Sequence, residues 1–256
     1  MLRSLGVLLP LEVAAVALVV LLALWRRGRR AGRLGERGQA DVPERIRDAL
    51  WGAGLGDGAA SALATEAAVF YYALAAWKRK PFAPPGTRAF SYHRRNAYAA
   101  ILYAVVGAAV IEMVAVDLMV RASHAKAANV LFIVDVFAAI WMLGFVRAVQ
   151  LRPIVLTADA LLIRNGLAAS VDVPLAGATI EFGRVRAPAK GTPRYLRAAM
   201  GEPNALIALR EPVMARRAYG RTRLVDRIGL VLDDPKSFES AWRSFVPEAP
   251  DFIHHM

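Results

Sequence analysis

The sequence predicts an α+β membrane protein, in which a helical transmembrane bundle precedes a β-rich sandwich or barrel that is capped by a C-terminal helix. The 256 residues are 57% hydrophobic and have a mean hydropathy of +0.37, which is high for a soluble protein. Apolar residues gather in long blocks before residue 150, whereas the later residues form short alternating runs separated by turns. We therefore expect two domains, residues 1–150 and residues 151–256.

Four apolar blocks form the expected transmembrane domain. Residues 98–120 and 127–147 are clear spans, because a bilayer core of about 30 Å needs roughly 20 apolar residues in a helix. The short polar loop between them makes them an antiparallel hairpin. Residues 5–25 form an uncleaved anchor, since a tryptophan and several arginines follow them instead of small residues. Residues 59–77 form a weaker span that is rich in alanine and interrupted by Glu66, and whether it crosses fully stays open.

Basic residues decide the expected orientation. The loop at residues 78–95 is rich in Lys and Arg and contains no acid, so the positive-inside rule places it in the cytoplasm. The basic residues expected at the membrane surface are Lys78, Arg79, Lys80, Arg94 and Arg95. Counting spans onward places residues 151–256 in the cytoplasm as well. The loop at residues 26–47 is also rich in arginine, so either it breaks the rule or residues 46–77 enter and leave the bilayer on one side.

The last hundred residues predict strands, a basic loop and one helix. Two strands joined by a turn at Ala158 and Asp159 are expected within residues 153–166. Four further strands are expected in the segments SVDVPL, TIEFGRV, NALIALREPV and RLVDRIGLVL, and residues 186–203 are expected to be a loop. The final segment, DDPKSFESAWRSF, predicts a helix, with Asp234 as its N-cap and an apolar stripe of aromatic residues.

This pattern resembles the bacterial pleckstrin-homology-like domain. The similarity lies in the strands that contain LTADALLIRNG and VDVPLAGATIEF, followed by VLDDPKSFESAW and one amphipathic helix. The family is often fused to membrane spans, and the stretch FSYHRRNAY before a span with an internal Glu resembles the same membrane-anchored group. The resemblance implies a β-barrel-like sandwich capped by a helix, without catalytic residues, which contacts proteins or lipids at the bacterial inner membrane.

Three acidic residues lie near the middle of the expected spans: Glu66, Glu112 and Asp135. Each lies on the side of its helix that carries small residues, where membrane helices pack closely. We expect these residues to meet in one intramembrane polar cluster. They then serve as protonated hydrogen-bond partners between helices, hold a proton or a cation, or occupy independent positions, and the sequence leaves these alternatives open. Asp117 lies one turn from the end of its span and is expected to reach the interface.

The expected function follows from these features and from the absence of others. The chain has no cysteine, and no nucleophile, metal-ligand or phosphate-loop motif has a recognisable context, so we expect no catalytic residue, metal or cofactor. The net charge of +12 points to anionic lipid and not to nucleic acid, because many arginines flank apolar blocks. We expect a non-enzymatic, multi-pass protein whose cytoplasmic domain docks a protein partner or the membrane surface. The expected partners of the chain are the lipid bilayer and either a protein partner or further copies of the chain. The alternative is a small oligomeric ion- or proton-coupled transport component that uses Glu66, Glu112 and Asp135.

Overall fold

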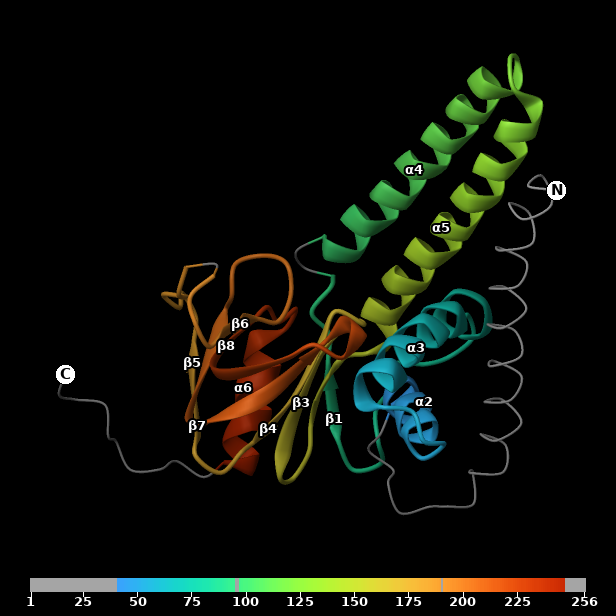
Figure 1. Cartoon of the computed structure of the whole chain (residues 1–256). Coiled ribbons are helices and arrows are strands. Elements are labelled where there is room, and N and C mark those ends of the chain that lie inside the picture. The colour runs from blue at the N-terminus through green and yellow to red at the C-terminus, as the bar shows by residue number, and fades with distance from the viewer. Residues whose placement is uncertain (1–40, 95–96, 190, 247–256) are drawn as a thin grey trace. The chain divides into compact units, whose positions relative to one another are not determined.

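The computed structural model describes residues 41–94, 97–189 and 191–246, which divide into two compact units (Figure 1). The helical unit comprises residues 41–77 and 103–145, and the β unit comprises residues 78–102 and 146–246. The expected span at residues 5–25 lies outside the described residues.

The helical unit begins with two helices that pack against each other, α2 (Val42–Trp51) and α3 (Asp57–Phe70). A capping box starts α2: the Asp41 side chain accepts a hydrogen bond from the Glu44 N–H at 3.4 Å, and Glu44 Oε2 accepts one from the Asp41 N–H at 3.2 Å. A short π-helix, η1 (Tyr71–Ala75), continues α3. Most of the two long helices α4 (Tyr98–Arg121) and α5 (Ala125–Leu151) belongs to this unit, whereas the start of α4 and the end of α5 belong to the β unit.

Close backbone contact joins α3 to α5. A Cβ atom at Gly144 would overlap the carbonyl oxygen of Val69, so only glycine allows the two helices to approach this closely. The rings of Phe70 and Phe137 lie 5.2 Å apart at the same interface. A glycine therefore sets the distance between these two helices.

Two helices in the described part of the chain, α4 and α5, are long and apolar enough to cross a membrane. Their most hydrophobic windows have mean hydropathies of 2.3 and 2.2, and large apolar side chains such as Ile111 and Met119 are 72% and 76% exposed. The helices match the expected segments 98–120 and 127–147 in position, length and apolarity. The expectation of about four spans is not met among the described residues, because residues 59–77 form only the 14-residue helix α3 followed by η1.

The β unit is built around one twisted sheet that is closed by a helix. Its strands are paired in the order β1-β2-β3-β4-β7-β8-β6, with β5 paired to β7, and the β6–β8 pair is parallel. The elements of the unit in chain order are β1 (Arg88–Phe90), β2 (Ile154–Leu156), β3 (Ala160–Asn165), β4 (Ala169–Pro174), β5 (Ala178–Phe182), β6 (Tyr195–Arg197), β7 (Ala205–Arg217), η2 (Ala218–Gly220), β8 (Thr222–Leu230) and α6 (Pro235–Phe245).

All six predicted strands and the predicted C-terminal helix are present. The side chain of Asp234 caps α6 by accepting a hydrogen bond from the Ser237 N–H at 3.1 Å, as predicted. Phe238 and Trp242 are buried and stack with ring centroids 6.2 Å apart, so the aromatic stripe of α6 faces the core. Two three-residue strands, β1 and β6, were not predicted, and β6 lies inside the expected loop at residues 186–203.

Strand β1 places a segment of the expected membrane domain in the β unit. It pairs antiparallel with β2, with Phe90 opposite Ile154, although α4 and α5 separate the two strands in the chain. The Phe90 ring packs edge-on against Phe238 at 4.8 Å, and the buried Tyr92 hydroxyl accepts a hydrogen bond from the Gly166 N–H at 2.8 Å. The helical hairpin is therefore an insertion between two neighbouring strands of one sheet.

The pairing of β1 with β2 yields a test of membrane topology. Because both ends of the α4–α5 insertion meet in one sheet, they lie on the same side of any membrane that the helices cross. The chain has no cysteine of its own, so we expect Ala83→Cys and Ser240→Cys to react with an impermeant maleimide from one side, and Ser123→Cys, in the hairpin turn, from the other. Labelling in right-side-out and inside-out vesicles measures this. Labelling of all three variants from the same side would show that the hairpin does not cross.

Candidate functional site

The three acids predicted to form a polar cluster lie on three different helices. Glu66 is half-buried on α3, and its Oε2 accepts a hydrogen bond from Trp141 Nε1 of α5 at 3.1 Å. Glu112 is exposed on α4, and Asp135 is partly buried on α5. Among the described residues, no group of three or more His, Asp or Glu side chains is placed to hold a metal ion. Glu66 therefore has Trp141 as a hydrogen-bond partner, and the three acids do not form a metal site among the described residues.

Asp117, the predicted interfacial acid, is held by an arginine one turn later on α4. The Arg121 guanidinium donates two hydrogen bonds to the Asp117 carboxylate, at 2.7 and 3.0 Å, and a third to Asn129 of α5 at 2.9 Å. Such a bidentate pair is both directional and strong. The bond from Arg121 to Asn129 joins α4 to α5 next to their connecting turn.

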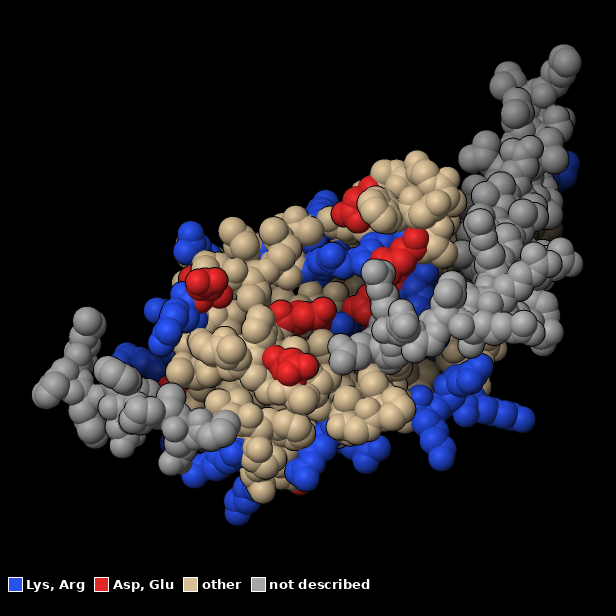
Figure 2. Space-filling model, turned by 90° about the horizontal axis from the view of Figure 1, so that it is seen from below, with Lys and Arg blue, Asp and Glu red and all other residues tan. Residues whose placement is uncertain are grey.

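The basic residues predicted at the membrane surface follow an exposed tryptophan. Lys78, Arg79 and Lys80 are exposed and come directly after Trp77, whose side chain is 53% exposed. Tryptophan beside cations is the composition of a membrane–water interface. Arg94 is exposed as well, and Arg95 lies outside the described residues. Figure 2 shows basic side chains projecting along the edges of the face of the molecule seen there.

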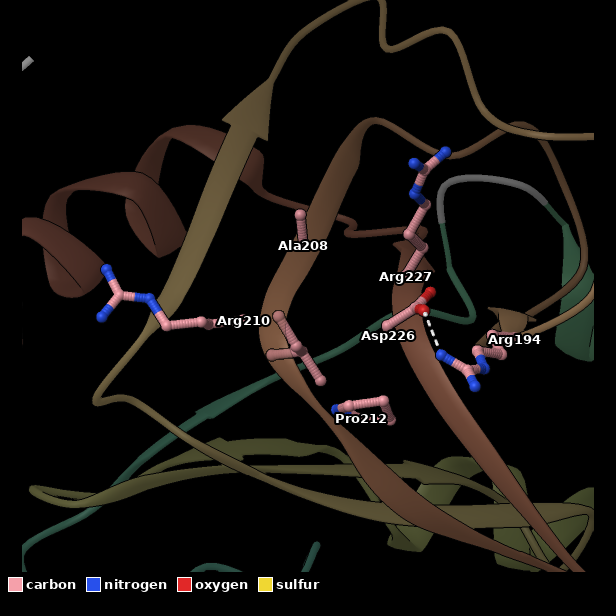
Figure 3. Close-up of a pocket in the computed structure, with 7 residues that line it drawn as sticks. Arg194, Ala208, Arg210, Pro212, Asp226 and Arg227 are labelled. Carbon is pink, nitrogen blue, oxygen red and sulfur yellow. Dashed lines mark ion pairs between the residues drawn. The ribbon is translucent and has the colours of Figure 1, made fainter. Parts of the chain in front are cut away.

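A hollow of about 270 Å³ in the β unit marks a place where the sheet is interrupted (Figure 3). Strand β7 pairs with β8 up to Ala208 and again from Val213, so four residues of β7 lie opposite Asp226 alone. Pro212 lies in this interval and has no N–H to give to the ladder. The hollow is lined by Arg194, Ala208, Leu209, Arg210, Pro212, Asp226 and Arg227.

The backbone of Arg194 is held in an unusual conformation at the edge of this hollow. Its φ is +57°, in the left-handed region that side-chain-bearing residues rarely adopt. Its carbonyl oxygen accepts hydrogen bonds from the N–H groups of Asp226 and Arg227, at 3.0 and 3.3 Å. A bulge in the ladder and a strained residue therefore coincide, and such features cluster at functional sites.

The charges of the hollow are unbalanced. Arg194 and Asp226 point toward one another, with Nη1 and Oδ2 3.8 Å apart, whereas the Arg210 side chain extends away from them (Figure 3). The lining residues include three arginines and one aspartate, a formal charge of +2, beside three apolar residues, and the Arg210 guanidinium lies on the outer side. This lining can attract an anionic group. The hollow could not be predicted from the sequence, because its lining residues come from separate segments. The available signal was Pro212 inside a predicted strand, since proline interrupts the hydrogen bonding of a sheet.

Comparison of the chain with protein-family models, curated proteins and solved structures finds no significant match.

A second feature of the β unit is a half-buried histidine next to Tyr92. Burial lowers the pKa of His93; Asp233 opposes this shift, and Arg94 adds to it. Its Nδ1 is buried without a hydrogen-bond partner within the described part of the chain. The Asp233 carboxylate accepts hydrogen bonds from the Arg94 N–H, with both oxygens at 3.0 Å. Burial therefore favours the neutral form of His93, which lies where β1 leads into α4.

The lowered pKa of His93 predicts a pH-dependent stability. Below its ordinary pKa of about 6.5, the unfolded chain binds more protons than the folded chain, so the stabilisation present above this pH is lost as the pH falls. We expect the free energy of unfolding to decline as the pH falls below about 6.5, and His93→Gln to flatten part of that decline. Guanidinium unfolding over a pH series measures this. His124→Gln, which alters an exposed histidine, is the control, and an equal slope in His93→Gln would contradict the prediction.

The contact of Glu66 with Trp141 predicts a measurable coupling between α3 and α5. In a double-mutant cycle of Glu66→Ala and Trp141→Phe, we expect a coupling of about 0.5–1.5 kcal/mol, because the variants remove the two partners of one hydrogen bond. Denaturant unfolding in detergent measures it. The matched cycle pairs Trp141→Phe with Glu112→Ala and should give a coupling near zero. A cycle for Glu66 that also gives zero would remove this contact from the interface.

Proposed function

We propose that the protein is a non-enzymatic, membrane-anchored binding protein of the bacterial inner membrane. In this proposal α4 and α5 cross the bilayer, and the β unit is a pleckstrin-homology-like domain on the cytoplasmic side. The β unit binds an acidic segment of a protein partner in the arginine-lined hollow. The observation that carries the proposal is the coincidence of a broken ladder, a strained arginine and unbalanced positive charge in one hollow.

The anchoring role is supported by the surface of the two long helices. Their exposed side chains are apolar over most of their length, which favours contact with lipid over contact with water. Both helices lie within an insertion in the sheet of the β unit, so the anchor and the binding domain are joined at both ends. The basic segment after Trp77 favours a cytoplasmic position for that end.

The binding role is supported by the chemistry of arginine. A guanidinium group donates hydrogen bonds to a carboxylate in a planar, two-point geometry, and it stays charged at all physiological pH values. The Arg194 side chain is 58% exposed, so its pairing with Asp226 leaves much of it open to a ligand. Arg227 also lines the hollow and is exposed, so it supplies a second guanidinium group at this place.

A glutamate-rich peptide tests this proposal with the full-length protein in nanodiscs of zwitterionic lipid. We expect Arg194→Gln and Arg227→Gln each to weaken binding about two- to fivefold, because an exposed ion pair contributes roughly 0.2–1 kcal/mol. Fluorescence anisotropy of the labelled peptide measures the affinity. Lys236→Gln removes an exposed charge outside the hollow and should leave the affinity unchanged. Equal affinity of the wild type and the Arg194/Arg227 double variant would overturn the proposal.

A further inference from the structure

The turn between β7 and β8 concentrates positive charge on the β unit. We call residues 214–224 the arginine turn: it contains four arginines and no acid. Arg216, Arg217 and Arg221 are exposed. Arg223 is only half-exposed, and its guanidinium donates a hydrogen bond to the Thr192 carbonyl at 2.9 Å. Three of the four guanidinium groups are therefore presented to the surroundings.

Apolar side chains are exposed among these arginines. Met214 and Leu224 lie directly opposite each other in the β7–β8 ladder and are 51% and 46% exposed. Tyr219, at the tip, is 46% exposed and has a φ of +61°. Exposed apolar and aromatic groups next to cations are typical of segments that lie in a membrane interface.

Contacts within the β unit place the arginine turn beside the end of α5. The Ala218 N–H donates a hydrogen bond to the Ala168 carbonyl at 3.1 Å, which joins the tip to the turn between β3 and β4. In that same turn, a Cβ atom at Gly166 would lie 2.7 Å from Cγ2 of Val149 on α5. Figure 1 shows the β7–β8 hairpin reaching toward this end of α5.

The start of α4 lies at the same end of the β unit. The Tyr98 hydroxyl donates a hydrogen bond to Asn165 Oδ1, at the end of β3, at 3.4 Å. The neighbouring Gly166 carbonyl accepts a hydrogen bond from the buried Arg152, just after α5. The arginine turn and the two ends of the helical hairpin therefore surround one turn of the sheet.

We infer that the arginine turn binds the headgroups of anionic lipids in the leaflet that α4 and α5 enter. This inference rests on the proposed anchoring by these helices. It adds a second ligand, anionic lipid, at a place outside the hollow. Helices that enter the bilayer hold their own end of the β unit at the membrane surface, so lipid is the partner within reach of the turn. Lipid phosphates accept charge-assisted hydrogen bonds from guanidinium groups, and Tyr219 and Leu224 can insert among the headgroups.

A fluorophore at Thr222→Cys tests the inference in the full-length protein. Thr222 is exposed in the arginine turn, and the natural chain has no competing cysteine. The label is quenched by lipids that carry a nitroxide on the headgroup, so quenching reports contact with the membrane surface. We expect strong quenching in nanodiscs with about one-third phosphatidylglycerol, and weaker quenching in pure phosphatidylcholine or at high salt, because salt screens exposed charges.

Matched variants separate lipid binding from a general effect of charge. Arg216→Gln, Arg217→Gln and Arg221→Gln together should lower the ratio of bound to free turn roughly a hundredfold and reduce quenching to the phosphatidylcholine level. The same three positions changed to Lys keep the charge and should keep the quenching. The control set consists of three exposed arginines elsewhere in the β unit changed to Gln: Arg184, Arg186 and Arg197.

The outcomes that would overturn the inference are distinct from failure of the proposed function. Equal quenching in both lipids, or an equal loss in the control set, would show that the arginine turn does not bind anionic lipid specifically. Quenching that is displaced by the glutamate-rich peptide would assign the turn to a protein partner instead. Failure of the hairpin to cross the membrane is detected separately by labelling of Ser123→Cys, and failure of the hollow by the peptide measurement.

Discussion

The pairing of β1 with β2 is the constraint on which the organisation of the β unit depends. Two three-residue strands form a weak ladder on their own, and the sequence between them contains both long helices. The pairing is stabilised from outside the ladder: Phe90 packs against Phe238 of α6, and Tyr92 holds the Gly166 N–H. Since burial raises the pKa of Tyr92 well above its ordinary value, the hydroxyl stays protonated in this contact. The edge of the sheet, the capping helix and the ends of the hairpin are thus parts of one packed region.

The positive charge of the chain is divided between structural and available arginines. Arg152 and Arg164 are buried; the first donates to the Gly166 carbonyl, and the second to Asp172 and to the Val171 carbonyl. Arginines of this kind stabilise turns and strand edges and cannot reach a ligand. Exposed arginines line the hollow and the arginine turn, and others, such as Arg184, Arg186 and Arg197, lie elsewhere in the β unit. The net charge of +12 therefore says less about binding than the positions at which guanidinium groups stay exposed.

Strong periodicity made part of this structure predictable. Helices α4 and α5 follow from long apolar runs, and α6 follows from its cap and its aromatic stripe. Strand β1 was missed because it lies in a basic segment, although the buried Tyr92 shortly after it marks the sheet edge. The fourth span was overpredicted because alanine is apolar enough for a membrane and also suits the close packing of α3 on α5. The length and composition of α4 and α5 match the predicted membrane spans, and the location in a membrane stays a prediction.

The candidate sites depend on register and not on local pattern. Arg194 and Asp226 meet because β6 runs beside β8, and the bulge appears only when the β7–β8 pairing is known. The bond from Trp141 to Glu66 likewise needs the packing of two helices that are distant in sequence. Side-chain chemistry was readable from the sequence, but the partners of each side chain were not. The sequence accordingly named the acids and the surface cations without identifying the hollow.

An insertion between paired strands also has a consequence for biogenesis. During synthesis, β1 emerges before the helical hairpin and its partner β2 emerges after it, so the sheet cannot close until both helices have been made. If the helices cross the bilayer, the pairing of β1 with β2 also requires that α5 brings the chain back to the side of the membrane on which β1 lies. If only one helix crossed the bilayer, β1 and β2 would lie on opposite sides of the membrane. Phe238 would then lack its contact with the ring of Phe90. Completion of this sheet edge therefore depends on the insertion of both helices.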